Sequence, residues 1–242
     1  MLLMIRILKI FIWFLPFLLL TGCAPFDKIY SHDFSSGNFK LKTPGELPEN
    51  VYLTLKDDSV VVFRLSGKRT GTIDKSSCNG ININSVIPGS FLYNSTLVKT
   101  SVDLDLSTVL LKFRPTRGDV PAQLNTHVNG LIYAGFRKDF FKIQTHSNEL
   151  NETNSFVRHI GFDIGLFAGI GITPVNPTVT MNMTIQEYDG IIFQKGISVF
   201  ATYENMSVGL AFGFDNLIDK NKIIWIYNQK PWIGIALGIA NF

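Results

Sequence analysis

Several segments of this chain alternate between large apolar residues and glycine or other small residues. The clearest is MSVGLAFGFD (206–215), and GFDIGLFAGIGI (161–172) and WIGIALGIANF (232–242) nearly repeat the arrangement. Because successive side chains of a β-strand point to opposite faces, each segment predicts a strand with one large apolar face. The other face carries mainly glycine, alanine and serine, which weaken a strand in water. The small-residue face must therefore meet something other than bulk water.

Two architectures compete for this pattern. A soluble sandwich would place Lys, Glu, Thr and Arg on the face opposite its core, and these segments place few such residues there. A small closed barrel favours small residues in its interior and has a wholly apolar exterior when it meets lipid. The segments are 10 to 12 residues long, close to the roughly 9–11 residues of a tilted transmembrane strand. We therefore predict a membrane barrel; the alternative is a soluble, lipocalin-like barrel that binds an apolar ligand inside.

The predicted fold class is all-β, with a small antiparallel up-and-down β-barrel of about eight strands over residues 96–242. The expected strands are 101–114, 127–136, 138–146, 156–172, 189–203, 206–217, 222–228 and 231–242. The first strand alternates up to Leu106 and then changes phase, which predicts a β-bulge or a break. Five aromatic residues with polar tips fall at expected strand ends, where a bilayer interface would hold them. They are Tyr188, Tyr203, Trp225, Tyr227 and Trp232.

A shorter module is predicted ahead of the barrel, over residues 30–95. The runs NVYLTL and SVVVFRLSG flank Lys56-Asp57-Asp58, which predicts a β-hairpin with a tight polar turn. Other short apolar runs between turn residues favour a small antiparallel sheet for this part.

The first 22 residues have the layout of a secretory signal. Arg6 and Lys9 precede the apolar run IFIWFLPFLLL, which is too short for a permanent membrane span. Leu20-Thr21-Gly22-Cys23 then resembles the bacterial lipobox. The resemblance implies cleavage before Cys23, a diacylglycerol on its thiol and an acyl chain, such as palmitate, on its new amino terminus. An ordinary cleaved signal, or a buried Cys23 in an uncleaved segment, are the alternatives.

With Cys23 lipidated, residues 23–29 form a tether and no disulfide partner is left for Cys78. Cys78 lies beside Asn79-Gly80, a turn signal, so we expect a loop thiol without chemistry. No cofactor is expected beyond the covalent lipid. Two or more acyl chains make such an attachment stable.

The composition agrees with an exported, membrane-associated protein. Of the 242 residues, 46% are hydrophobic and 17% charged, and the mean hydropathy is +0.20. Removal of residues 1–22 takes away two basic residues and no acidic one, which leaves 20 basic against 19 acidic residues. A nucleic-acid-binding protein would show a basic excess or stripe, so nucleic acid is excluded as a partner.

Four stretches resemble outer-membrane β-barrel-like proteins of Bacteroidota, several of which carry lipoprotein signals. They are LKFRPTRGDVPAQLNTHVNGLIYAGFR (111–137), GFDIGLFAGIG (161–171), EYDGIIFQKGISVF (187–200) and FGFDNLIDKNKIIWIYNQKPWIGIALGIANF (212–242). The resemblance covers roughly residues 30–242. It implies a barrel fold and an outer-membrane location, and it lends no reaction.

Few residues suggest chemistry. His32, His127, His146 and His159 have no carboxylate or cysteine at ligand spacing and are expected in loops or at strand ends. Asp163 and Asp215 fall on the small-residue face, so a barrel would point them inward, where they need basic partners such as Lys112 or Arg114. An internal polar network is the expected role, with a narrow pore or ligand cavity as the alternative, and no catalysis is expected.

The sequence thus predicts a lipid-anchored outer-membrane barrel with a structural, interaction or narrow transport role. Its expected partners are outer-membrane lipid and other envelope proteins. Ala24 is not the Asp that retains lipoproteins in the inner membrane of enterobacteria, and no acidic run follows Cys23. We therefore expect the anchor in the periplasmic leaflet and the module of residues 30–95 on the periplasmic side.

Overall fold

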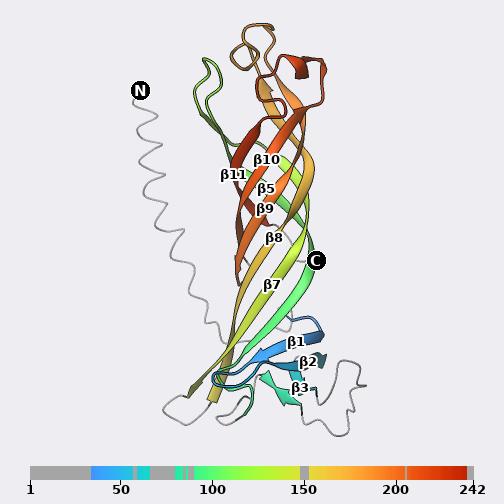
Figure 1. The fold of residues 1–242 in the computed structure, drawn as a ribbon, viewed down its shortest axis with the longest axis vertical. Helices are drawn as coiled ribbons and strands as arrows, with labels where there is room; N and C mark the ends of the chain where they lie inside the picture. The colour runs from blue at the N-terminus through green and yellow to red at the C-terminus, as the bar shows by residue number, and fades with distance from the viewer. Residues whose placement is uncertain are drawn as a thin grey trace, which may run out of the picture.

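The computed structural model describes residues 34–56, 59–65, 80–83, 86, 90–147, 153–204 and 206–238 (Figure 1). Cys23, Cys78 and the expected leader and tether lie outside them. The strands are β1 (Gly37–Lys42), β2 (Glu49–Lys56), β3 (Ser59–Arg64), β4 (Ile81–Asn82), β5 (Thr96–Arg114), β6 (Gln123–Asn125), β7 (Asn129–Ser147), β8 (Thr153–Val175), β9 (Tyr188–Tyr203), β10 (Met206–Leu217) and β11 (Pro231–Gly238). Two 3-10 turns, η3 (Thr178–Thr180) and η4 (Lys220–Ile223), follow β8 and β10.

Six strands close into an antiparallel barrel. The hydrogen-bonded order is β11-β10-β9-β8-β7-β5, and β11 pairs back to β5. Consecutive strands are neighbours throughout, so the topology is up-and-down. The predicted fold class, an all-β antiparallel barrel behind a short β-rich part, is confirmed.

The described barrel has fewer strands than the eight expected. Residues 127–136 and 138–146 were expected as two strands, but they form the single strand β7 because Arg137 faces the barrel interior and does not mark a turn. Residues 222–228 are not a strand: part of η4 and a turn occupy them, and the aromatic residues that suggested a strand pack over the barrel end. Four of the six strands have between 16 and 23 residues, whereas β10 has 12 and β11 has 8.

The phase change in β5 is a β-bulge, as the sequence predicted. Val109 pairs with Ala236 and Leu111 with Ile235, so Leu110 is the extra residue. The bulge shifts the parity of the strand and turns Lys112 and Arg114 inward; without it both cations would lie on the outer face. Where the β5–β7 ladder ends, the Asn129 side chain continues it, accepting from the Val109 amide at 2.7 Å and donating to the Val109 carbonyl at 2.8 Å.

The N-terminal strands extend the same sheet. β1 pairs with the first residues of β5, and the predicted hairpin forms as β2 and β3. The lower parts of β5 and β7 contribute Leu97, Phe141 and Ile143 to the apolar core that β1, β2 and β3 bury. Figure 1 shows these short strands gathered at the lower end of the barrel.

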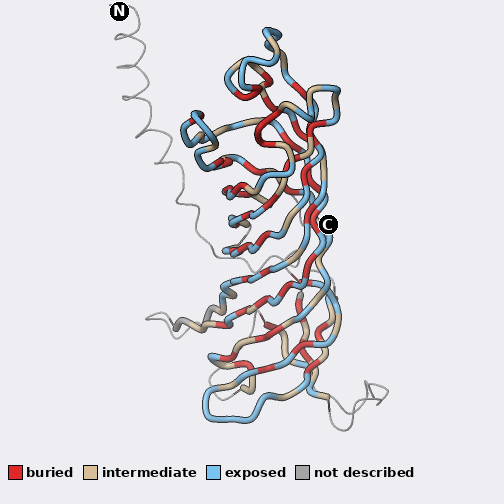
Figure 2. Tube along the Cα trace, turned by 45° about the horizontal axis from the view of Figure 1, so that its top comes forward, coloured by how far each residue is buried: buried red, intermediate tan, exposed pale blue. Residues whose placement is uncertain are grey.

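Buried and exposed residues alternate along the barrel strands, as the tube in Figure 2 shows. In β9 and β10 nearly every second residue is buried and its neighbours are exposed. Two further clusters of buried apolar residues follow the one shared with β1–β3, one in the middle of the barrel and one at the end opposite the N-terminal strands.

Candidate functional site

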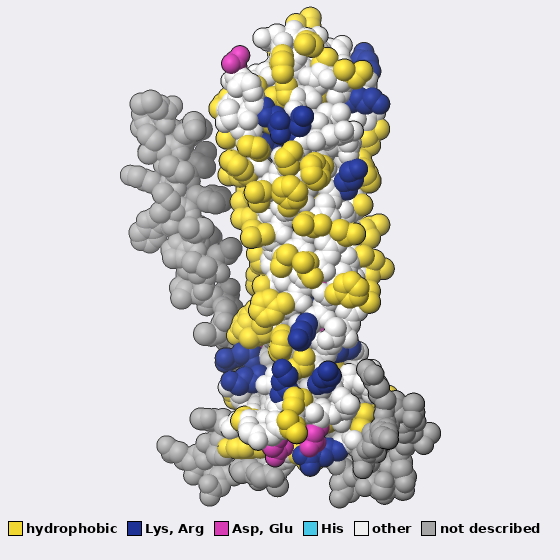
Figure 3. All heavy atoms as spheres, in the orientation of Figure 1, with side chains coloured by type: hydrophobic (Ala, Val, Ile, Leu, Met, Phe, Trp, Pro, Cys, Tyr) yellow, Lys and Arg dark blue, Asp and Glu magenta, His cyan; other side chains and the backbone are white. Residues whose placement is uncertain are grey.

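The outer surface of the barrel carries a band of exposed apolar side chains, one face of which is seen in Figure 3, and on β9 the exposed Lys195 interrupts it. On β8 every outward position from 160 to 172 is apolar, and at about 3.3 Å per residue and a tilt of about 45° this stretch rises roughly 28 Å. That height is close to the apolar band of a membrane barrel. We call it the apolar band; its large members include Val102, Leu104, Leu106, Leu110, Phe113, Ile132, Phe136, Ile160, Phe162, Ile164, Leu166, Ile170, Ile172, Ile191, Phe193, Ile197, Val199, Val208, Leu210, Phe212, Ile233 and Ile235.

The outward direction of the large residues is the opposite of what a soluble barrel needs. Leu210 is 65% exposed, whereas its neighbours Gly209 and Ala211 are buried. Soluble monomers rarely expose a contiguous apolar patch of more than a few hundred Å². The band surrounds the barrel, so water would be a poor solvent for this face.

The aromatic residues expected at a bilayer interface divide into two groups. Tyr203 is exposed at the end of β9, and Tyr188 is half-buried. The expectation is wrong for Trp225, Tyr227 and Trp232, which are buried. Trp232 points into the barrel, and the other two lie beside the Arg114 guanidinium, 5.3 and 5.0 Å from their ring centres.

Glycine on the inner face lets neighbouring strands approach closely. A Cβ atom on Gly165 would lie 2.2 Å from the carbonyl oxygen of Ala134, and one on Gly196 would lie 2.1 Å from that of Phe212. Both distances are far below van der Waals contact. The small residues of the alternating segments are therefore required by the narrow interior.

Enlarging an inner-face residue should overpack the barrel. A Cβ on Gly209 would already lie 2.5 Å from Phe200 Cδ1, so we expect Gly209→Leu to cost about 1–3 kcal/mol. Ala211→Ser adds one small polar atom and serves as the tolerated control. Denaturant unfolding in detergent micelles measures both, and equal stability of the two variants would contradict a filled interior.

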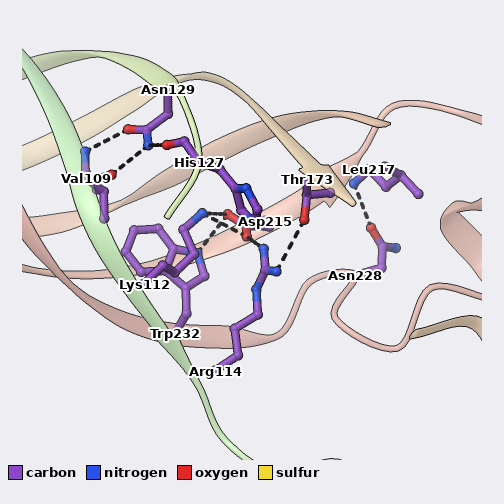
Figure 4. A network of polar contacts seen from close by, with 10 residues as sticks. All are labelled: Val109, Lys112, Arg114, His127, Asn129, Thr173, Asp215, Leu217, Asn228 and Trp232. Carbon is purple, nitrogen blue, oxygen red and sulfur yellow. Dashed lines mark hydrogen bonds and ion pairs between the residues drawn. The ribbon is translucent and has the colours of Figure 1, made fainter. Parts of the chain in front are cut away.

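Asp215 is the centre of a polar network in the upper part of the barrel (Figure 4). It is fully buried, and its carboxylate accepts from Lys112 Nζ at 3.0 Å, from Arg114 at 2.5 Å and from Trp232 Nε1 at 2.8 Å. Arg114 also donates to Thr173 Oγ1 at 3.3 Å. The structure thus brings together three of the four residues that the sequence singled out. Two cations surround one carboxylate, and the donors leave its oxygens no unsatisfied position.

Asp163 belongs to a second network nearer the N-terminal strands and does not contact Lys112 or Arg114. It accepts a hydrogen bond from the Tyr133 hydroxyl. Close by, Asp139 accepts from Arg137 Nε at 2.9 Å and lies 2.8 Å from His159 Nε2. Arg137 also pairs with Asp103 at 3.5 Å.

Sequence reasoning missed most of this second network. His159 was expected in a loop or at a strand end, and that is wrong: it is buried within β8 and stacks on Phe141. The inward parity of Arg137 and Asp139 on β7 was the available signal, but the cluster RKD resembled a turn. His127, by contrast, lies between β6 and β7, in a loop as expected.

Aromatic side chains separate the two networks. Tyr133 packs edge-on against Phe200 with ring centres 5.2 Å apart, and Phe167 lies 5.9 Å from Trp232. A cavity of about 10 Å³ remains beside the lower network, lined by Asp103, Tyr133, Asp163 and their neighbours. That volume holds about one water molecule at most. The interior is thus a packed core with polar ends.

The described residues contain no cluster of His, Cys, Asp and Glu that could hold a metal ion. No helix among them is long and apolar enough to cross a membrane. No protein family, no curated protein and no solved structure matches the chain. The band and the interior described above therefore carry the functional argument.

Proposed function

We propose that this protein is a lipid-anchored, integral outer-membrane β-barrel with a structural or interaction role and no catalytic activity. The observation that carries the proposal is the side of the barrel wall to which the large apolar side chains point. Large apolar side chains point outward on all six barrel strands. Most charged residues of the wall at the same height point inward, where Lys112 and Arg114 pair with Asp215 and Arg137 pairs with Asp139. The exceptions among the described residues are two exposed cations, Lys138 opposite Phe162 near the lower rim and Lys195 opposite Ala168. Lipid is the solvent that suits this arrangement.

The packed interior argues against the two other roles considered for the barrel. Transport requires a continuous polar path, whereas Tyr133, Phe167, Phe200 and Trp232 fill the middle of the barrel. A lipocalin-like protein needs an apolar cavity of several hundred Å³ for its ligand. The cavity beside Tyr133 and Asp163, in the described part of the interior, measures about 10 Å³ and falls far short of that size. The surface of the barrel, its ends and the N-terminal strands are left to carry the function.

The deciding experiment separates the barrel from the lipid anchor. Residues 1–23 are replaced by an ordinary cleaved secretory signal, and membranes carrying this variant are extracted with sodium carbonate. We expect the unlipidated chain to remain with the membrane, because the apolar band holds it there. Release into the supernatant, with the lipidated parent retained, would favour a soluble barrel tethered by Cys23.

Lipidation itself is tested by metabolic labelling. Radiolabelled palmitate should enter the parent chain and should not enter Cys23→Ala, because the thiol and the new amino terminus of Cys23 are the expected acylation sites. Immunoprecipitation and autoradiography give the result. Equal labelling of both chains would refute the lipobox assignment and would leave the barrel proposal standing.

A further inference from the structure

The edge of the apolar band nearest the N-terminal strands carries a row of cations. Lys42 of β1 pairs with Thr96 of β5, Thr96 with Lys142 of β7, and Lys142 with Arg158 of β8. Directly opposed residues of neighbouring strands share a face, and the three cations are exposed on the outside. We call Lys42, Lys142 and Arg158 the basic row. Figure 3 shows Lys and Arg side chains gathered just below the apolar band.

None of these cations forms an ion pair with a carboxylate among the described residues. The acidic residues beside β1, Glu46 and Glu49, both form ion pairs with Arg64, with nitrogen–oxygen distances of 4.0 and 2.9 Å. Asp139, next in the chain to Lys138, faces inward and binds Arg137 and His159. Lys142 and Arg158 lie directly opposite each other, an arrangement that is destabilising for like charges unless an anion lies between them.

The surroundings of the basic row are those of a bilayer interface. Moving from the basic row toward the middle of the apolar band, the next outward pair on β7 and β8 is Phe140 with Ile160. The pair after that is Lys138 with Phe162. The Lys138 ammonium lies 5.7 Å above the Phe140 ring, so this side chain bends away from the band and toward the basic row. Long cationic side chains at the rim of a band direct their charge to the headgroup layer in this way.

The opposite rim of the band has a different charge character. Glu187 and Asp189 are exposed there, near the start of β9, together with Lys220 and Lys222 of η4. Charges of both signs can neutralise one another at that end. Among the described residues, exposed basic residues therefore outnumber exposed acidic ones at the end where the N-terminal strands lie and not at the opposite rim.

We infer that the basic row binds the phosphate groups of anionic phospholipids, in the same leaflet that holds the acyl chains of Cys23. This inference rests on the proposed membrane location. Neighbouring strands are about 4.8 Å apart, so a phosphate is small enough to lie between Lys142 and Arg158 and accept from both. The acyl chains of the bound phospholipid would then cover Phe162 and the part of the apolar band above it.

The test uses the full lipidated chain in two lipid settings. The variant Lys142→Gln/Arg158→Gln is compared with Lys222→Gln/Lys230→Gln, which removes the same charge from exposed positions at the other end. Each chain is reconstituted in phosphatidylcholine vesicles with or without phosphatidylglycerol, and the lipid retained is measured by native mass spectrometry. Each cation near a membrane surface changes binding roughly fivefold, so we expect phosphatidylglycerol retention to fall about 25-fold in the first variant and little in the control.

Thermal unfolding gives an independent reading. In phosphatidylcholine alone, the Lys142→Gln/Arg158→Gln variant should be at least as stable as the parent, because a repulsive pair has been removed. Phosphatidylglycerol should then raise the melting temperature of the parent and of the control more than that of the variant. A variant stabilised as much as the parent would overturn the inference.

Two further outcomes are informative. If inorganic phosphate displaces phosphatidylglycerol at the same concentration of phosphate groups, the row is a general anion site and the lipid assignment is wrong. Carbonate extraction of the vesicles separates this inference from the proposed function. A chain that stays inserted without a preference for phosphatidylglycerol refutes the lipid site alone, and a chain that is released refutes both.

Discussion

Asp215→Ala is expected to destabilise the barrel by about 3–5 kcal/mol, because it leaves two buried cations without a counter-charge. Lys112 and Arg114 are both at least nine-tenths buried, and in the described part of the chain Asp215 supplies the only carboxylate within 4 Å of their charged groups. Trp232 Nε1 loses its acceptor in the same step. Denaturant unfolding in detergent micelles, followed by tryptophan fluorescence, measures the change.

Asp163→Asn is the matched control for this prediction. Asp163 is also a buried inward aspartate, but its hydrogen-bond partners are the neutral Tyr133 hydroxyl and the Asp103 carboxyl group, and neither is a cation. An amide oxygen can accept the hydrogen bond of Tyr133. A loss of about 1 kcal/mol or less is expected. Adding Lys112→Met to Asp215→Ala should recover part of the larger loss, since one unpaired charge is removed. Equal losses of stability for Asp215→Ala and Asp163→Asn would contradict the prediction that the charge of Asp215 stabilises the barrel by neutralising Lys112 and Arg114.

Leu210→Arg should be the most harmful charge substitution on the outer face of β10. Leu210 lies near the middle of its strand, so in the proposed membrane barrel an arginine there would enter hydrocarbon at a cost of roughly 2–4 kcal/mol. Stability is measured by unfolding the chain from phospholipid vesicles with guanidinium. The same variant in a soluble barrel of this orientation would gain water contacts and lose nothing.

Met206→Arg is the control for depth. Met206 has the same outward parity and lies at the end of β10, and its exposure of 69% is close to the 65% of Leu210. If water covers the band, the two arginines should behave alike; if lipid covers it, Met206→Arg near the interface should cost only about 0–1 kcal/mol. A difference of less than about 1 kcal/mol between the variants would contradict the membrane location.

The faces of the strands were predictable from the sequence because side-chain parity is a local property. Once a barrel is assumed, the alternation between Gly209 and Leu210 shows which residues of the strand face the interior and which face outward. The change of parity in β5 predicted the bulge that turns Lys112 inward. The same local rule placed Asp163 and Asp215 in the interior.

The register between two strands is set by residues far apart in the sequence. It decides which side chains contact each other inside the barrel. Tyr133 and Asp163 come together only because β7 and β8 pair with Arg137 opposite Asp163. Strand length was also misjudged, because a charged cluster within β7 has the composition of a turn. Trp225 and Tyr227 resembled strand residues, but the segment between β10 and β11 folds back over the barrel end and buries them.

β5 has pairing partners from both ends of the described chain, and this has a consequence for folding kinetics. It bonds to β1 and β7 along its first residues, and to β6 and β11 along its last. Phe113 and Ile233 meet across the closing seam although about 120 residues separate them. Because contacts at such separation require most of the chain to be ordered first, barrel closure is expected to be slow and to come last. Until β11 pairs with β5, the backbone hydrogen-bonding groups along that edge of β5 have no strand partner. The unclosed barrel therefore has an exposed strand edge and an exposed apolar band at the same time.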